Sequence, residues 1–211
     1  MDFREGMLVS VAAILVNIAP ANAGPLHDAA RSGDLTQLKQ LLASGAEIEE
    51  RDGTEETPLI SAAIAGQAEV VAELIMRGAN VMARNDRGMT ALHAAAYGGN
   101  LEAAKLLVGA GAGVNDADDK FKVTPLIVAS EENRADVAEF LLQSGADIHL
   151  SERHGYTALT RAGFKKRWDV VQLLLKNGGQ CQSAKVAGDW WATQCAIQVI
   201  KEVTNRLGGP P

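Results

Sequence analysis

Leucines and small apolar residues recur along this chain in a unit that is copied five times. The unit is clearest in segment 88–96, which reads Gly-Met-Thr-Ala-Leu-His-Ala-Ala-Ala. The anchoring leucines have spacings of 33, 33, 34 and 33 by subtraction: Leu26, Leu59, Leu92, Leu126 and Leu159. A set of glycines repeats with the same spacings: Gly45, Gly78, Gly111, Gly145 and Gly178. Repetition at one fixed period predicts a solenoid of stacked units.

Each unit predicts two short helices joined by a tight turn. A threonine precedes Pro or Ala at the start of the first helix, as expected of an N-cap and the first helical position. Gly33, Gly66 and Gly99 follow that helix and supply a left-handed turn. The second helix carries a pair of large apolar residues, such as Leu74-Ile75. One helix pair cannot bury its apolar face alone, so neighbouring copies must stack.

The repeated text resembles the ankyrin repeat. The resemblance rests on Thr57-Pro58-Leu59, Thr90-Ala91-Leu92-His93-Ala94-Ala95, Thr124-Pro125-Leu126 and Thr157-Ala158-Leu159. It covers Pro25 to about Gln182 and implies an all-α ankyrin-repeat solenoid with short hairpin arms. Five helix-pair repeats are expected at about 25–52, 53–85, 86–118, 119–151 and 152–182.

Three residues replace the turn glycines. The fourth arm contains one extra residue, and Lys122 stands there where Gly88 and Gly155 stand in other arms. Between the paired helices, Asn133 and Lys166 occupy the glycine position. Asparagine visits the left-handed region readily, whereas lysine does so at a cost. We therefore expect either a remodelled turn or some backbone strain at Lys166.

Residues 183–207 predict one C-terminal capping helix. Gly188 lies one repeat period after Gly155, but no turn residue near Val199 ends the helix that follows. The apolar stripe of this helix is expected to cover the exposed end of repeat five. One face carries Trp190, Ile197, Ile200 and Leu207, and beside it lie Trp191, Cys195 and Val199. Residues 208–211 are expected to be a disordered tail.

The first 23 residues predict a cleaved signal peptide. Met7–Ala19 is a 13-residue apolar run, and Ala21-Asn22-Ala23 fits a small-x-small cleavage site. The repeat text begins at Pro25, directly after the predicted cut. The run is short for a membrane span, so the mature chain is not expected to insert into a membrane. The alternative is a buried N-terminal helix. Export predicts a periplasmic or secreted protein.

Export changes the interpretation of the two cysteines. Cys181 and Cys195 flank the boundary between the last repeat and the C-terminal segment. In an oxidising compartment they are expected to form a disulfide, worth roughly 3 kcal/mol in the loop-entropy model. Two buried small residues are one alternative. A redox-active pair is the other, although the C-x-x-C spacing is absent.

Composition and motifs argue against several functions. The net charge is -6, from 20 basic and 26 acidic residues, which disfavours nucleic-acid binding. No phosphate loop, nucleophile elbow or H-E-x-x-H helix occurs, so we expect neither an enzyme nor a cofactor. His27 and His93 occupy one repeat position two copies apart, about 20 Å in a helix stack, and cannot share a metal. The resemblance implies that both histidines bond to the backbone near the arms. His149 and His154 lack further ligands.

Acidic residues gather in the arm that leads into repeat two. They are Glu47, Glu49, Glu50, Asp52, Glu55 and Glu56. The plain interpretation is a solvated turn. A docking strip for a basic partner or a weak calcium site are the alternatives, although no EF-hand spacing supports calcium.

Protein binding is the favoured function. In ankyrin-like stacks, partners bind the concave face formed by the arm tips and the first helices. The resemblance places these residues there: Thr54, Glu56, Ile64, Asp86, Arg87, Met89, Tyr97, Lys120, Phe121, Val123, Glu131, Arg153, His154, Tyr156, Phe164 and Lys165. We expect contact through the aromatic and apolar members and their polar neighbours, namely Met89, Tyr97, Phe121, Arg153, His154, Tyr156, Phe164 and Lys165. The alternative is that some of them are local filler.

A basic cluster accompanies these residues in repeat five: Arg161, Lys165, Lys166 and Arg167. The plain interpretation is a solvated helix end. The alternative is that, together with Tyr156, Phe164 and Trp168, it favours an acidic protein surface or an anionic headgroup. We expect an exported, monomeric, non-enzymatic module that binds an unidentified protein. Resemblance to small exported bacterial ankyrin proteins implies an inhibitor or protective partner of an envelope enzyme. A thiol-disulfide enzyme using Cys181 and Cys195, or a self-associating scaffold, are the alternatives.

Overall fold

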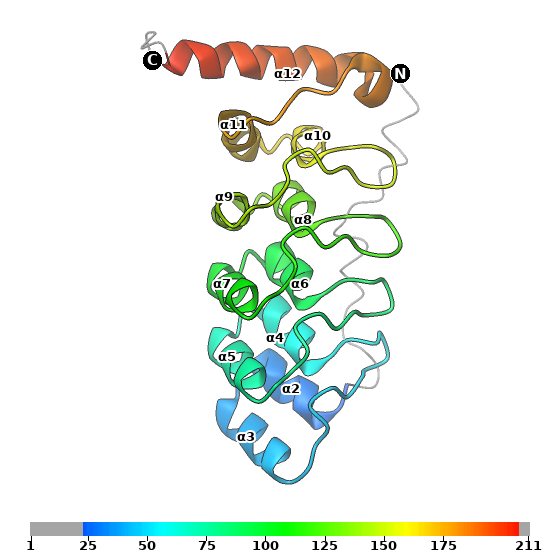
Figure 1. Cartoon of the computed structure of the whole chain (residues 1–211), viewed down its shortest axis with the longest axis vertical. Helices are drawn as coiled ribbons and strands as arrows, with labels where there is room; N and C mark the ends of the chain where they lie inside the picture. The colour runs from blue at the N-terminus through cyan, green and yellow to red at the C-terminus, as the bar shows by residue number, and fades with distance from the viewer. Residues whose placement is uncertain (1–22, 207–211) are drawn as a thin grey trace.

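The computed structural model describes residues 23–206, and in this part the chain forms helices stacked in two columns (Figure 1). The predicted tail and all of the predicted signal segment except Ala23 lie outside the described residues. Five antiparallel helix pairs are followed by one terminal helical element, whose backbone is kinked at Gly188 (φ 83°, ψ 158°) and continues as a long helix after it. The pairs are α2 Pro25–Ser32 with α3 Leu35–Ala43, α4 Pro58–Ala65 with α5 Ala68–Met76, α6 Ala91–Gly98 with α7 Leu101–Gly109, α8 Pro125–Glu131 with α9 Ala135–Gln143, and α10 Ala158–Phe164 with α11 Trp168–Lys176; the last helix is α12, Ala184–Arg206. The predicted fold class is confirmed.

The first helices begin where the sequence predicts. The Thr57 and Thr124 hydroxyls accept hydrogen bonds from the backbone N–H groups of Ile60 and Ile127, and a proline follows each threonine. All five anchoring leucines are buried, with at most 1% of their surface exposed. The alanines beside them are buried too, and their small size lets successive first helices approach closely.

A second set of contacts joins the repeats at the turn between paired helices. The residue that precedes the second helix donates hydrogen bonds to carbonyls at the end of the preceding repeat's first helix. These bonds run from Gln67 to Arg31, from Asn100 to Ala63 and Ile64, from Arg134 to Tyr97, and from Arg167 to Glu131. The four donors form what we call the turn ladder. It satisfies carbonyls that a helix end leaves without intrahelical partners.

Left-handed backbone is kept where glycine is replaced. Gly33, Gly66 and Gly99 have φ between 76° and 77°, and Asn133 and Lys166 have φ of 60° and 57°. The turn at Lys166 is therefore not remodelled, and the lysine adopts a conformation that costs about 1 kcal/mol or more. Lys122 in the fourth arm has φ 61°. Glu55, at the equivalent position of the second arm, has φ 58°, a replacement not predicted from the sequence.

The predicted orientation of the capping helix was wrong. Trp191, Cys195 and Gln198 are buried, whereas Trp190, Ile197 and Ile200 are 45%, 41% and 64% exposed. The reason lies on α10, because a Cβ at Gly163 would lie 1.9 Å from the Trp191 ring. The Trp191 ring therefore fills the space that Gly163 leaves open. Its neighbour Trp190 is displaced by about 100° around the helix and faces outward.

The predicted disulfide is present. The Sγ atoms of Cys181 and Cys195 are 2.06 Å apart, and Cys195 is fully buried. The bond ties the segment after α11 to the buried face of α12. It therefore helps to fix which face of α12 meets repeat five.

Replacing Trp191 by alanine should destabilise the C-terminal end by about 3–5 kcal/mol, because it empties a large buried volume. Trp190→Ala should change the free energy of unfolding by less than about 0.5 kcal/mol in dilute solution, since that ring is half exposed. Urea unfolding followed by circular dichroism measures both. Equal losses in the two variants would contradict the assigned orientation of α12.

Breaking the disulfide should loosen α12. The double variant Cys181→Ala with Cys195→Ala is expected to lose about 3 kcal/mol, because the unfolded chain gains the freedom of the opened loop. Urea unfolding of the wild type with and without reductant should show the same loss. The double variant controls for other effects of the reductant, which should leave its curve unchanged.

Candidate functional site

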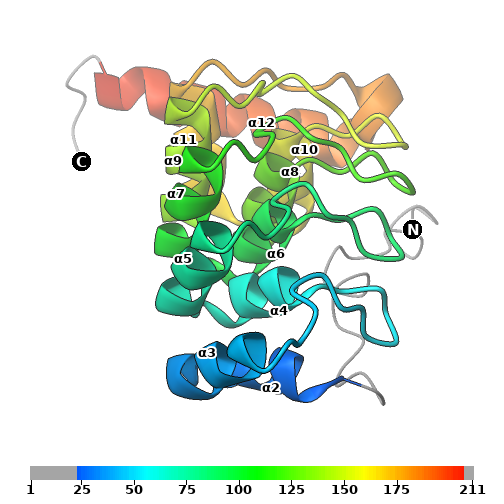
Figure 2. The same ribbon diagram turned by 60° about the horizontal axis from the view of Figure 1, so that its bottom comes forward.

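The arms project from the side of the stack that carries the first helices (Figure 2). We call the surface formed by the arms and the first helices the arm face. Each arm is closed around one buried polar residue, and these residues repeat with spacings of 33, 33 and 34 by subtraction: Asp52, Asn85, Asp118 and Glu152. One buried polar residue in each arm therefore supports the arm face.

Asp118 shows how such a residue shapes an arm. One of its oxygens accepts from the backbone N–H groups of Lys120 (2.8 Å) and Phe121 (2.6 Å), and the other from Val123 (2.6 Å). Asn85 closes the shorter third arm with one oxygen that accepts from Arg87 and Met89. A buried carboxylate is stable only when hydrogen bonds replace its lost hydration, so these bonds hold the backbone of the arm in place.

Neighbouring arms are also bonded to each other. The Arg84 guanidinium donates to the carbonyls of Gly88 (2.6 Å), in its own arm, and of Ala117 (3.1 Å), in the next. Further along, the backbone N–H of Arg153 donates to the Phe121 carbonyl at 2.7 Å. The arms consequently form a connected array rather than independent loops.

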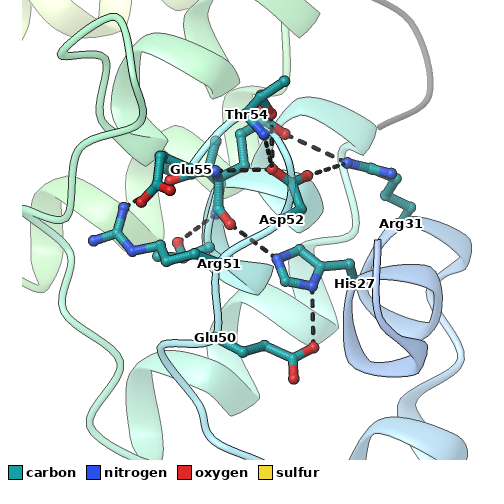
Figure 3. Close-up of polar contacts among 10 residues, drawn as sticks. His27, Arg31, Glu50, Arg51, Asp52, Thr54 and Glu55 are labelled. Carbon is teal, nitrogen blue, oxygen red and sulfur yellow. Dashed lines mark hydrogen bonds and ion pairs between the residues drawn. The ribbon is translucent and has the colours of Figure 1, made fainter. Parts of the chain in front are cut away.

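The structural role predicted for His27 and His93 is confirmed. The Thr90 N–H donates to Nδ1 of His93 (3.2 Å), so the proton of the neutral ring lies on Nε2, which bonds to the Val123 carbonyl (3.0 Å). His27 Nε2 likewise lies 2.9 Å from the Glu56 carbonyl oxygen (Figure 3). Each histidine thus links a first helix to the following arm. Burial lowers the pKa of His93, although the Val123 carbonyl opposes this shift.

The acidic residues of the second arm are largely used inside the molecule (Figure 3). Glu50 pairs with His27 (3.1 Å), and Arg31 pairs with Asp52 (3.0 Å) and Glu56 (3.5 Å). Burial opposes ionisation of Asp52, but hydrogen bonds from Thr54 and the Glu56 N–H outweigh it and lower its pKa. Within residues 23–206, no three His, Cys, Asp or Glu side chains are arranged to hold a metal.

One residue of the predicted binding set is not on the surface. Met89 was expected to be displayed, but only 1% of it is exposed. It closes the third arm through its backbone, which exchanges hydrogen bonds with Asn85, and its side chain packs in the core. Val123, at the equivalent position of the fourth arm, is buried in the same way. Met89 is therefore a core residue.

Repeat five and the cap bring four aromatic rings together, which we call the aromatic cluster: His154, Tyr156, Phe164 and Trp191. Tyr156 and Phe164 meet edge to face with ring centroids 5.1 Å apart, and Phe164 meets Trp191 at 6.3 Å. His154 stacks on Tyr156 at 6.4 Å. His154 is exposed, Tyr156 and Phe164 are partly exposed, and Trp191 is buried. Sequence reasoning missed the part played by Trp191, for which Gly163 was the available clue.

The other predicted aromatic residues lie apart from this cluster. Tyr97 ends α6 and Phe121 lies in the fourth arm, and both are partly exposed and packed against the core. Between the ends of α6 and α10 lies the end of α8 with Glu131 and its neighbour Glu132. Burial raises the pKa of Tyr97, and the charge of Glu132 raises it further. The predicted aromatic face is thus divided by an acidic position.

Glu131 also changes the interpretation of the basic cluster. It is buried, and the Arg161 guanidinium donates to its carboxylate at 2.6 and 2.8 Å. Lys165 lies 3.6 Å from its other oxygen, and Arg167 donates to its backbone carbonyl. Three of the four cluster residues therefore contact Glu131. Arg153 and Lys166 are exposed, so they present charge to solvent beside the aromatic cluster.

The comparison with protein families settles the class of the chain. A family model described as ankyrin repeats (3 copies) matches residues 26–118 and 110–185. This chain is an ankyrin-repeat protein.

Curated ankyrin-repeat relatives match a limited part of the chain. Ankyrin repeat domain-containing protein 63 of Homo sapiens is 34% identical over 90 residues, which are 39% of this chain and 24% of that protein. Inversin of Gallus gallus is 36% identical over 73 residues, 35% of this chain and 7% of that protein. The chain thus spans less than a quarter of each relative's length in these matches.

Acidification should weaken this ankyrin-repeat stack through His93. Because its pKa is lowered on folding, the folded state keeps the ring neutral while the unfolded chain takes up a proton below its ordinary value of 6.5. Stability from this group is thus complete above pH 6.5 and falls as the pH decreases, by up to about 1.4 kcal/mol per pH unit.

Replacing His93 by glutamine, a donor that does not titrate, should flatten this part of the pH dependence. Urea unfolding from about pH 7.5 to about pH 5.5 provides the measurement. The exposed residue His149 offers a matched control, His149→Gln. Parallel curves for the wild type and His93→Gln would show that another group causes the slope.

Proposed function

We propose that this protein binds another protein through the part of the arm face that belongs to its last three repeats. Ankyrin repeats are protein–protein interaction modules, and the family match supports that general role here. The finer proposal places contact at Tyr97, Phe121, Arg153, His154, Tyr156, Phe164 and Lys165. Met89 is not included because it is buried.

The observation that carries the proposal is the aromatic cluster at the edge of a rigid array of arms. Partly exposed aromatic rings supply large contact area with few rotatable bonds, and such rings are enriched at interface hot spots. The buried Asp118 and Glu152 hold the arms beside them. Since these arms are already ordered, little conformational entropy would be lost on binding.

The charges on the arm face favour an acidic partner surface at this end. In the fourth and fifth arms the exposed basic residues Lys120, Lys122 and Arg153 outnumber the exposed acidic residues Asp119 and Asp147. At the other end, the exposed Glu47 and Glu55 outnumber the exposed Arg51 in the arm that enters repeat two. Opposite charges at the two ends would align a partner of complementary charge, and this attraction would weaken as salt increases.

We also propose that the protein works after export. The segment 1–23 has the features of a signal peptide, with a cut after Ala23. The disulfide supports an oxidising compartment. No helix within the described residues is long and apolar enough to cross a membrane. In this setting, the proposed partner is an envelope enzyme that the protein inhibits or protects. The burial of Cys195 favours a structural bond over thiol exchange.

Reversing the charge at the aromatic cluster should abolish partner capture. The variant Arg153→Glu changes one exposed side chain, so its melting temperature should stay within about 2 °C of wild type while affinity falls at least about tenfold. Affinity capture from an envelope extract followed by titration with the purified partner measures this. Lys105→Glu, a charge reversal on α7, is the matched control.

Capture that is equally strong in the Arg153→Glu variant and in wild type would place the binding surface elsewhere. Capture that is lost in the Lys105→Glu control would point to the second helices instead. Sequencing the N-terminus of the exported protein tests the processing site, with a mature chain beginning at Gly24 as the expected result.

A further inference from the structure

The outward face of α12 carries apolar side chains that nothing within residues 23–206 covers. Trp190, Ile197, Ile200 and Val203 are between 41% and 64% exposed. Thr193 and Ala196 lie among them on the same side of the helix and are also exposed. The opposite side holds the buried Trp191, Cys195 and Gln198. In Figure 1, α12 closes one end of the stack, so this face is the terminal surface of the molecule.

We propose that this face binds a second copy of the chain, with the two α12 helices packed antiparallel about a two-fold axis. This inference is independent of the partner-binding site, which lies on the arm face. The sequence predicts a monomer and also predicts that repeat five covers this stripe. In the structure the stripe is exposed instead.

The charges on the face allow two copies to meet. Among residues 189–204, the exposed charged residues are Asp189 and Lys201, one of each sign. The face therefore carries no net charge, although the whole chain carries -6. Two copies that meet here avoid the repulsion between like-charged surfaces. The absence of a lysine- or arginine-rich polar border in this segment also disfavours a membrane surface as the occupant.

The other end of the stack does not offer a matching apolar surface. Repeat one exposes Asp28, Asp34, Gln37, Lys39 and Gln40. A head-to-tail contact would press the apolar face of α12 against these polar groups. Pairing of two identical α12 faces buries apolar surface on both sides, and such a contact closes at two copies rather than growing into a fibre.

The size of the α12 face sets the affinity expected between two copies of the chain. Apolar patches of roughly 300–600 Å² are the largest on typical monomers. Pairing two faces of that typical size would bury about 1,000 Å² in total, the lower limit for a specific interface. A weak dimer, with Kd in the micromolar range, is the expected result.

Analytical ultracentrifugation of the full chain from about 1 to about 200 µM tests the proposal, and a preparation beginning at Ala23 removes any contribution of the apolar run. The wild type should approach twice the monomer mass in both preparations. Trp190→Glu with Ile200→Glu should weaken association at least about tenfold without changing the circular dichroism spectrum. Met76→Glu, at a residue that is 75% exposed on α5, is the matched control and should dimerise like wild type.

Three outcomes would overturn the proposal. A wild type that stays monomeric throughout the range shows that the face does not bind a second copy. Unchanged dimerisation of the Trp190→Glu, Ile200→Glu variant places the interface elsewhere. A monomer that sediments with vesicles of mixed zwitterionic and anionic lipid assigns the face to a membrane surface. Retained partner capture by the monomeric variant would show that the arm face works independently.

Discussion

Adjacent repeats complete each other's hydrogen bonding. The turn ladder takes this role at one side of the stack, where Asn100, Arg134 and Arg167 donate to the ends of preceding first helices. At the arm side, His27 and His93 bond to carbonyls of the following arm. A helix end that is buried without such partners is unfavourable. No repeat is therefore complete by itself, and order in one depends on its neighbours.

The same dependence explains the form of the C-terminal end. Repeat five has no sixth repeat on its outer side, so another element must cover its apolar surface. Gly163 replaces the Ala or Ser found at the equivalent positions of other repeats, and Trp191 occupies the space so created. One large ring thus replaces the row of small residues by which complete repeats meet. The disulfide then holds α12 in this orientation.

Sequence reasoning succeeded where the physical demand was local and repeated. The anchoring leucines and the threonine N-caps follow from the repeated pattern, and the ankyrin resemblance implies the role of the two arm-linking histidines. The structure has each as expected. The cysteine pairing also followed from its context. These features recur or lie close in sequence, so a single chain shows them.

The predictions from sequence failed where residues distant in the chain determine which of two neighbouring or equivalent residues is buried. Trp190 and Trp191 are adjacent, and their opposite environments depend on Gly163 in another helix. Met89 and Tyr156 hold equivalent arm positions, yet one is buried and the other partly exposed, because the aromatic cluster exists only beside the cap. Glu131 was expected on the arm face but is buried, because Arg161 reaches its carboxylate from the next repeat. No repeating pattern in the sequence indicates any of these contacts.

The longer fourth arm shows where this architecture tolerates change. It holds one residue more than the third arm, and Asp118 absorbs the addition by accepting from three backbone N–H groups where Asn85 accepts from two. The helices on either side keep their places in the stack. An insertion in an arm can therefore alter what the protein recognises while leaving the scaffold intact, so evolution can diversify the arms at little risk to folding.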